Sequence, residues 1–198
     1  MAYKQHFVEW FSGKQLPSYW TAVNSNGATQ AMEDSVDGGL ITATGATNNA
    51  RGFIGFNQKR QYSPTGSVMI SVVKHGSLTG GESYVGLQDG SNSGSGKGAW
   101  THVDNSYKGT YFSLHTVGAG GSIFVESGYT ADTNWHTHKI ELTSSQASLE
   151  IDGTTTTTST VSSQLPAVDL APSVGINKNV NDSANRTLSI RYMEAYNT

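Results

Sequence analysis

The feature of this sequence that most restricts its fold is a series of short apolar or alternating runs, each bounded by Gly, Asn, Asp or Ser. The runs are rich in β-branched and aromatic residues, a composition typical of strands. No window combines a helical period with a capping residue in front of it. We predict strands at 5–11, 38–44, 51–57, 67–75, 82–88, 109–117, 122–127, 135–142, 147–152, 154–161, 173–178 and 187–196.

About twelve strands are too many for one flat sheet, so two sheets must stack face to face. We therefore predict an all-β fold, a two-sheet antiparallel β-sandwich. The length of 198 residues suits one such domain, which we expect to span residues 1–198. The glycine-rich stretch 86–100 has the composition of a linker. Strands continue on both sides of it, so we interpret it as a long surface loop of the same domain.

Charge and composition exclude several kinds of partner and chemistry. The 12 basic and 15 acidic residues leave a formal charge of -3 without a basic stripe, so we expect no nucleic-acid partner. No run approaches the ~18 apolar residues of a membrane span, so we expect no membrane insertion. The absence of cysteine removes thiol catalysis and zinc–thiolate sites. The start, "MAYKQHFVEWF", lacks the apolar region of a signal peptide, so either export is not used or a leader has been removed.

The stretch "WHTHKIELTSSQASLEIDG" (135–153) concentrates histidines and carboxylates. Residues two apart share one face of a strand, so His136 and His138 lie on the same face as an isoleucine and a leucine. The polar "TSSQ" supplies a turn, and "DG" ends the second strand. The polar faces of the two strands then coincide, and Lys139 can pair across the hairpin with Glu150 or Asp152. This arrangement explains the carboxylates as parts of an ordinary β-hairpin.

A metal site is the alternative for the two histidines, because H-x-H in a strand points both rings the same way. Zinc needs at least a third protein ligand, and His115 lies on a different predicted strand. The apolar companions Ile140 and Leu142 indicate that this face points to the core. We therefore favour structural histidines over metal ligands.

Three further segments resemble a known family when they are taken together with this hairpin. They are the N-terminal "FVEWFSGKQLPSYWTAV", the strand "GGLITATG" and the closing "LSIRYMEAYNT". The combination resembles the concanavalin A-like jelly rolls, which include laminin G-like domains and lectin-like modules. The resemblance extends over nearly the whole chain. It implies a concanavalin A-like jelly roll whose last strand pairs near the first, and it does not specify a ligand.

Laminarinase-type glycoside hydrolases share that fold and carry their carboxylates on one strand, in an E-x-D-x-E or E-x-D-x-x-E pattern. Retaining glycosidases need two carboxyl groups roughly 5 Å apart. Here "EIDGTTTT" supplies Glu150 and Asp152, but Thr154 and Thr155 occupy the positions of the second glutamate. Neither "MEDSVDGG" nor the glycine-rich "GSGKG" matches a catalytic motif. We therefore expect no catalytic residues and no enzyme.

Residues 84–111 combine aromatic rings with polar side chains, the mixture that sugar recognition requires. We predict a glycan site there, with Trp100 as the stacking ring and contacts from Asp89, Asn92, Asp104 and Tyr107. Asp89 and Asp104 are also candidate ligands for Ca²⁺, as in related laminin G-like domains, and we expect no other cofactor. The alternative is that the aromatic residues anchor a loop to the core and the aspartates are solvated turn residues.

These observations lead us to expect a non-enzymatic structural and recognition protein displayed on a virion, as a capsid decoration, head fibre or tail component that can bind surface glycans. The Gly/Ser/Thr/Asn-rich, weakly charged composition and the lack of a leader favour this interpretation. Its partners would be other virion proteins, further copies of itself and cell-surface polysaccharide. It would be made in the host cytoplasm without a signal peptide. The alternative is a secreted, extracellular, lectin-like module of a polysaccharide-active system.

Overall fold

The computed structural model describes residues 5–33, 39–44, 49–56, 59, 61–89, 96–104, 111–178 and 184–198. Strands dominate these ranges, and the only helix in them is the short 3-10 turn η1 (Ser162–Gln164). No helix in the described part of the chain is long and apolar enough to cross a membrane.

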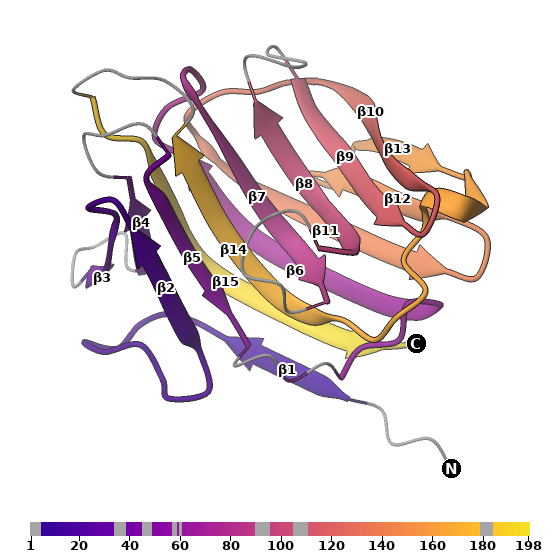
Figure 1. Cartoon of the computed structure of the whole chain (residues 1–198), viewed down its shortest axis with the longest axis horizontal. Helices are drawn as coiled ribbons and strands as arrows, with labels where there is room; N and C mark the ends of the chain where they lie inside the picture. The colour runs from indigo at the N-terminus through magenta and orange to yellow at the C-terminus, as the bar shows by residue number, and fades with distance from the viewer. Residues whose placement is uncertain are drawn as a thin grey trace.

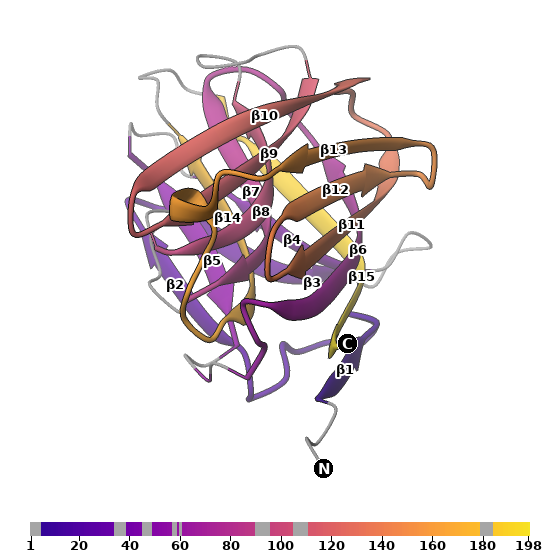
Figure 2. The same cartoon turned by 90° about the vertical axis from the view of Figure 1, so that its right-hand side faces the viewer.

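The strands form two antiparallel sheets that stack as a sandwich (Figures 1 and 2). The eight-stranded sheet has the order β13-β12-β11-β6-β15-β4-β3, and β1 also pairs with β15. Its strands are β13 (Thr155–Ser159), β12 (Ala147–Ile151), β11 (Trp135–Thr143), β6 (Gly66–His75), β15 (Thr187–Asn197), β4 (Gly39–Ala43), β3 (Thr29–Glu33) and β1 (His6–Glu9).

The seven-stranded sheet has the order β10-β9-β8-β7-β14-β5-β2. It comprises β10 (Gly121–Thr130), β9 (Tyr111–Gly118), β8 (Gly98–Asp104), β7 (Gly81–Gln88), β14 (Ala171–Lys178), β5 (Arg51–Gly55) and β2 (Thr21–Ser25). Figure 1 looks onto this sheet, with the eight-stranded sheet behind it. At one end the edge strands β10 and β13 approach each other and close the sandwich (Figure 2). The predicted two-sheet β-sandwich is confirmed.

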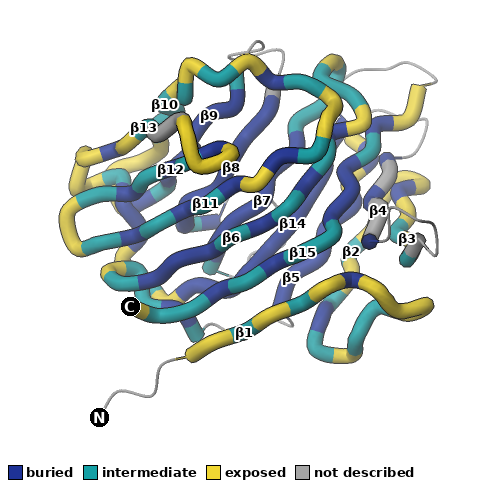
Figure 3. Tube along the Cα trace, turned by 180° about the vertical axis from the view of Figure 1, so that it is seen from behind, coloured by how far each residue is buried: buried dark blue, intermediate teal, exposed yellow. Residues whose placement is uncertain are grey.

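The core lies between the sheets because the strands alternate apolar and polar residues with a period of two. In the β11–β12 hairpin, Ile140 faces Leu149 and Leu142 faces Ala147, and all four residues are at most 2% exposed. Figure 3 shows the same alternation along β6 and β11, where buried and half-buried residues follow one another. The inward face predicted for the 135–142 strand is therefore confirmed.

Strand β8 differs from the sequence expectation, because residues 98–100 were interpreted as part of a loop and no strand was predicted over residues 101–104. The strand pairs with β7 on one side and β9 on the other, at the centre of the seven-stranded sheet. Ala99 and Val103 point into the core and are at most 2% exposed. The flanking glycines and the shortness of the alternating run conceal this strand in the sequence. Strands β2 and β3 were also not predicted.

Candidate functional site

The outer face of the seven-stranded sheet carries polar and aromatic side chains on strands β7, β8 and β14. These strands lie side by side in the sheet (Figure 1). In β7, Ser83 points inward, since its hydroxyl contacts a histidine of the opposite sheet. Because side chains alternate along a strand, Glu82 and Tyr84 point outward. The register places Asn177 of β14 beside Glu82, and His102 of β8 beside Tyr84. Three strands therefore bring these residues to one face.

Hydrogen bonds join four of the side chains on this face. Asn177 Nδ2 donates to Glu82 Oε1 over 2.6 Å, and His102 Nε2 lies 3.2 Å from Glu82 Oε2. Arg51 of β5 extends the row, because its Nε donates to Asn177 Oδ1 over 3.2 Å. The carboxylate of Glu82 is thus held from two sides by residues of neighbouring strands.

The environment of Glu82 favours the ionised carboxylate. The hydrogen bond with His102 lowers the pKa of Glu82, and the hydrogen bond from Asn177 adds to this effect against the opposing effect of burial. Its side chain is 33% exposed, whereas the side chain of His102 is 5% exposed. An oriented carboxylate that reaches solvent can accept hydrogen bonds from the hydroxyl groups of a ligand.

Aromatic rings surround this polar row and lie against the sheet. Phe53, Tyr84 and Trp100 project from the same face and are at most 4% exposed. Tyr84 covers Gly175 of β14 so closely that a Cβ atom at that glycine would come within 2.2 Å of the ring. His115 of β9 lies beside Trp100, with 4.5 Å between the ring centroids. Burial lowers the pKa of His115 to about 3, so this ring is neutral.

The structure corrects the role predicted for Trp100. We expected its ring to stack on a sugar, but the residue is 1% exposed and packs against Tyr84 and His115. A ring buried in this way offers no face to a ligand. The alternative interpretation, in which Trp100 is an anchoring residue, describes its observed position.

The other predicted glycan and calcium residues are only partly within the described chain. Asn92 and Tyr107 lie outside the described residues, as does the side chain of Asp104, whose backbone pairs with Glu82. Asp89 follows β7, and its backbone N–H donates to the carbonyl of Lys97. Among the residues that the structure describes, no group of three or more histidines and carboxylates could hold a metal ion. The calcium site stays a prediction.

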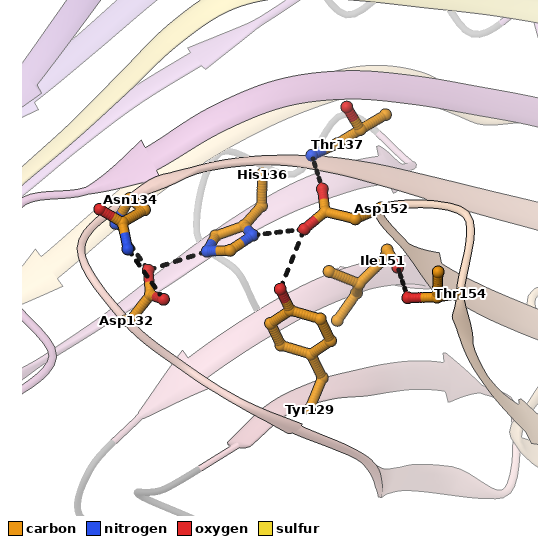
Figure 4. A network of polar contacts seen from close by, with 8 residues as sticks. All are labelled: Tyr129, Asp132, Asn134, His136, Thr137, Ile151, Asp152 and Thr154. Carbon is orange, nitrogen blue, oxygen red and sulfur yellow. Dashed lines mark hydrogen bonds and ion pairs between the residues drawn. The ribbon is translucent and has the colours of Figure 1, made fainter.

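The histidines of the 135–153 stretch have separate roles. His136 lies between two aspartates (Figure 4): Nδ1 is 2.7 Å from Asp152 Oδ2, and Nε2 is 2.8 Å from Asp132 Oδ1. Asp152 also accepts hydrogen bonds from the hydroxyl of Tyr129 and the backbone N–H of Thr137. This network connects the end of β10, the start of β11 and the β12–β13 turn.

The cross-strand ion pair predicted for Lys139 is not formed in the expected way. Its Nζ lies 3.2 Å from Glu141 of the same strand, and Asp152 is occupied by His136. The register does place Lys139 opposite Glu150. Asp152 could not be assigned from the sequence because its backbone turns into the left-handed region, at a φ of 52°, and redirects its side chain.

His138 points into the core, as predicted from Ile140 and Leu142 on the same face of the strand. Its ring lies 4.8 Å from that of Phe112 and 6.0 Å from that of His75. Burial lowers the pKa of His138 well below its usual value and that of His75 to about 3, so both rings are neutral. Neither nitrogen of His138 has a hydrogen-bond partner among the described residues.

No protein-family profile and no curated protein matches this sequence. Several solved structures do match its fold. Apo Crh5 transglycosylase has a TM-score of 0.69 at 13% identity, over 98% of this chain and 84% of that chain. A putative β-glucanase from Mycobacterium abscessus has a TM-score of 0.68 at 13% identity, over 96% and 98% of the two chains. A Bacillus licheniformis β-glucanase has a TM-score of 0.67 at 11% identity, over 98% of both chains.

These neighbours contradict the prediction of a non-enzymatic virion protein. The proteins that share the architecture over nearly the whole chain are described as a transglycosylase and as β-glucanases. The expectation that the chain is not an enzyme is corrected by the same finding. The alternative that placed the chain in a polysaccharide-active system agrees better with these neighbours. At identities of 11 to 13% the likeness establishes the architecture, and the chain has the concanavalin A-like jelly-roll fold.

Proposed function

We propose that this chain is a polysaccharide-active protein that binds a glycan along the outer face of its seven-stranded sheet, with Glu82 in contact with the sugar. The observation that carries the proposal is the ionised, partly exposed carboxylate of Glu82, held by His102 and Asn177 of the two neighbouring strands near one end of β7. The fold shared with transglycosylases and β-glucanases supports it.

The chemistry of this face suits a neutral sugar. The carboxylate of Glu82 can accept hydrogen bonds from two hydroxyl groups, and the exposed Arg51 supplies a donor beside it. Phe124 of β10 is half-buried and stacks on His115 at a centroid distance of 3.7 Å, so it adds apolar area on the same face. Aromatic area together with a few oriented polar groups is the usual composition of a small-ligand site.

A specific observation favours catalysis as well as binding. Glycoside hydrolysis with retention needs two carboxyl groups about 5 to 5.5 Å apart. The β7–β8 register pairs the backbone of Glu82 with that of Asp104, so two residues that carry carboxyl groups occupy facing positions on adjacent strands. The pair would come from two adjacent strands. This differs from the single-strand E-x-D-x-E pattern, whose absence led to the expectation of no enzyme.

In that reaction Glu82 fits the role of the ionised carboxylate. Its lowered pKa keeps it charged at neutral pH, which suits a nucleophile or a group that stabilises positive charge on the sugar. A general acid needs a raised pKa and would be a different group.

The proposal is tested by incubating the protein with mixed-linkage β-glucan and measuring both new reducing ends and transfer products. Glu82→Gln and Asp104→Asn are the test variants. Glu150→Gln, a carboxamide change on the opposite sheet, is the matched control. We expect Glu82→Gln to lower turnover by about 10²- to 10⁴-fold, and the control to act like the parent protein.

Binding is measured in parallel, because it separates the two functions. Binding without turnover that is weakened by Glu82→Gln would identify a lectin-like module of a polysaccharide-active system. If Glu82→Gln changed neither turnover nor binding, the proposed site would be wrong.

A further inference from the structure

A second cluster of aromatic and polar side chains lies on the outer face of the eight-stranded sheet. Figure 3 shows the course of its strands β1, β15 and β6, on the opposite side of the molecule from the view of Figure 1. Strand β1 runs along the C-terminal half of β15, so that His6 pairs with Tyr196 and Val8 with Glu194. A cleft of about 470 Å³ lies here, and its lining includes His6, Glu194, Tyr196 and Ile70 of β6. The cleft is therefore separate from the Glu82 site.

Glu194 is the polar centre of this cleft. The hydroxyl of Tyr192 donates to Oε2 over 2.6 Å, and Nε2 of His6 lies 2.8 Å from Oε1. The hydrogen bond from Tyr192 lowers the pKa of Glu194, which keeps the carboxylate ionised at neutral pH. A carboxylate has about four acceptor positions, so two hydrogen bonds leave capacity for ligand hydroxyl groups.

Exposed apolar side chains extend the cleft along the strands. Trp10, just beyond β1, is 65% exposed, and its ring centroid lies 4.5 Å from that of Tyr192. Among the described residues the exposed large hydrophobic side chains are Val8, Trp10 and Val161. Val8 is paired with Glu194 of the cleft, and Trp10 lies against Tyr192. A concentration of exposed apolar area beside polar groups marks an interaction site.

We infer that this surface, formed by Trp10, Tyr192, Glu194, His6 and Tyr196, is a second glycan-binding site. One sugar unit of a neutral oligosaccharide lies in the cleft, with its hydroxyl groups on Glu194, and the next stacks on the indole of Trp10. The inference goes beyond the proposed function and does not depend on it, because the two sites are on opposite sheets.

Charge and shape favour this occupant over others. The ionised Glu194 repels an anionic ligand, and its hydrogen-bonded geometry suits hydroxyl groups. The platform is a tryptophan and a tyrosine next to an open cleft that contains the carboxylate of Glu194, which matches the alternation of apolar and polar edges on a sugar ring.

The experiment uses the full chain carrying Glu82→Gln. This substitution weakens the site on the seven-stranded sheet, so that binding at that site does not mask binding at the second site. The probes are oligosaccharides of mixed-linkage β-glucan and of N-acetylglucosamine. Binding is followed by titration calorimetry and by the indole N–H resonance of Trp10 in ¹⁵N–¹H spectra. In this background we expect a probe to shift that resonance, and Trp10→Ala to weaken binding about tenfold, or ~1.4 kcal/mol. Glu194→Gln should also weaken binding.

Trp135→Ala is the matched control, because Trp135 lies on the same face but stacks on Arg191 away from the cleft. It should bind like its parent. The inference is overturned if no probe shifts the Trp10 resonance, or if Trp10→Ala binds like its parent. It is also overturned if sedimentation shows that Trp10→Ala only abolishes self-association, since the surface would then join copies of this chain. Loss of all binding with Glu82→Gln alone would overturn it while leaving the proposed function intact.

Discussion

His136 and Asp152 are joined by a 2.7 Å hydrogen bond that ties the start of β11 to the β12–β13 turn (Figure 4). Asp132 engages the other ring nitrogen at 2.8 Å, so the imidazole lies between two carboxylates. Burial disfavours the charge on His136, but the hydrogen bonds with the two aspartates outweigh it and raise the pKa of His136. His136 and Asp152, which stand out in the sequence, therefore form a structural clamp with Asp132 at one end of the sandwich.

Replacing Asp152 by Asn should destabilise the protein by about 1 to 2 kcal/mol, because His136 loses a charged partner in a partly exposed network. Urea unfolding of the variant and the parent protein measures the difference. Asp169→Asn is the control, since Asp169 is an exposed loop residue. Equal stabilities of all three proteins would show that the clamp contributes nothing.

The contribution of this clamp should depend on pH in a bell-shaped manner. The pKa of His136 is raised above its ordinary value of 6.5, so its contribution is full below about pH 6.5 and is lost as the pH rises through the folded-state value. The pKa of Asp152 is lowered from 3.8, so its contribution is present above about pH 3.8 and is lost at lower pH. The stability difference between the parent and Asp152→Asn, measured by unfolding from pH 3 to 9, should be largest between these limits. A difference that is flat over this range would contradict the assignment.

The buried His138 should make the core sensitive to acid. Its pKa is lowered by burial, so between the folded and unfolded values the unfolded chain binds more protons and stability falls as the pH falls. The slope is about 1.4 kcal/mol per pH unit for one such group. His138→Leu should lose less stability than the parent between pH 6.5 and 5, as measured by urea midpoints.

Gly175→Ala should destabilise the seven-stranded sheet by about 1 to 3 kcal/mol, because the new methyl group would collide with the ring of Tyr84. Thermal unfolding measures this loss. Gly13→Ala is the control, since the nearest atom to a Cβ there is 3.6 Å away. An unchanged melting temperature for Gly175→Ala would mean that Tyr84 can move away from the sheet without cost.

Two tryptophans should respond differently to truncation. Trp100→Ala should cost about 3 to 5 kcal/mol, because the side chain is 1% exposed and leaves a cavity. Trp10→Ala should change stability by less than about 0.5 kcal/mol, because the residue is 65% exposed. The free energy of unfolding in urea distinguishes these outcomes, and a small effect at Trp100 would contradict its position in the core.

The function expected from the sequence rested on composition, and this explains why it was wrong. A weakly charged surface rich in Gly, Ser, Thr and Asn is common to many β-rich proteins, because these residues populate turns and solvent-facing strand positions. Composition therefore indicates a β-rich surface and does not distinguish a virion protein from a protein that acts on polysaccharides.

Local patterns in the sequence were sufficient for the fold class and for much of the hairpin. The alternation of "WHTHKIEL" and "ASLEI" placed His138 and Ile140 on the buried face, because the two-residue period of a strand is a property of neighbouring residues alone. The same reasoning did not predict β8, because glycines flank its short alternating run. The structure nevertheless places this strand inside the seven-stranded sheet.

The grouping of functional side chains was decided only by the tertiary structure. Glu82, His102 and Asn177 come from three strands separated by 20 and 95 positions in the chain, and they meet because β7 lies between β8 and β14. Likewise, β1 reaches Glu194 only because the first strand pairs with the last. Strand order depends on which apolar faces bury one another across the whole chain. The alternation of residues within one strand shows which face is buried, but it does not determine which strands become its neighbours.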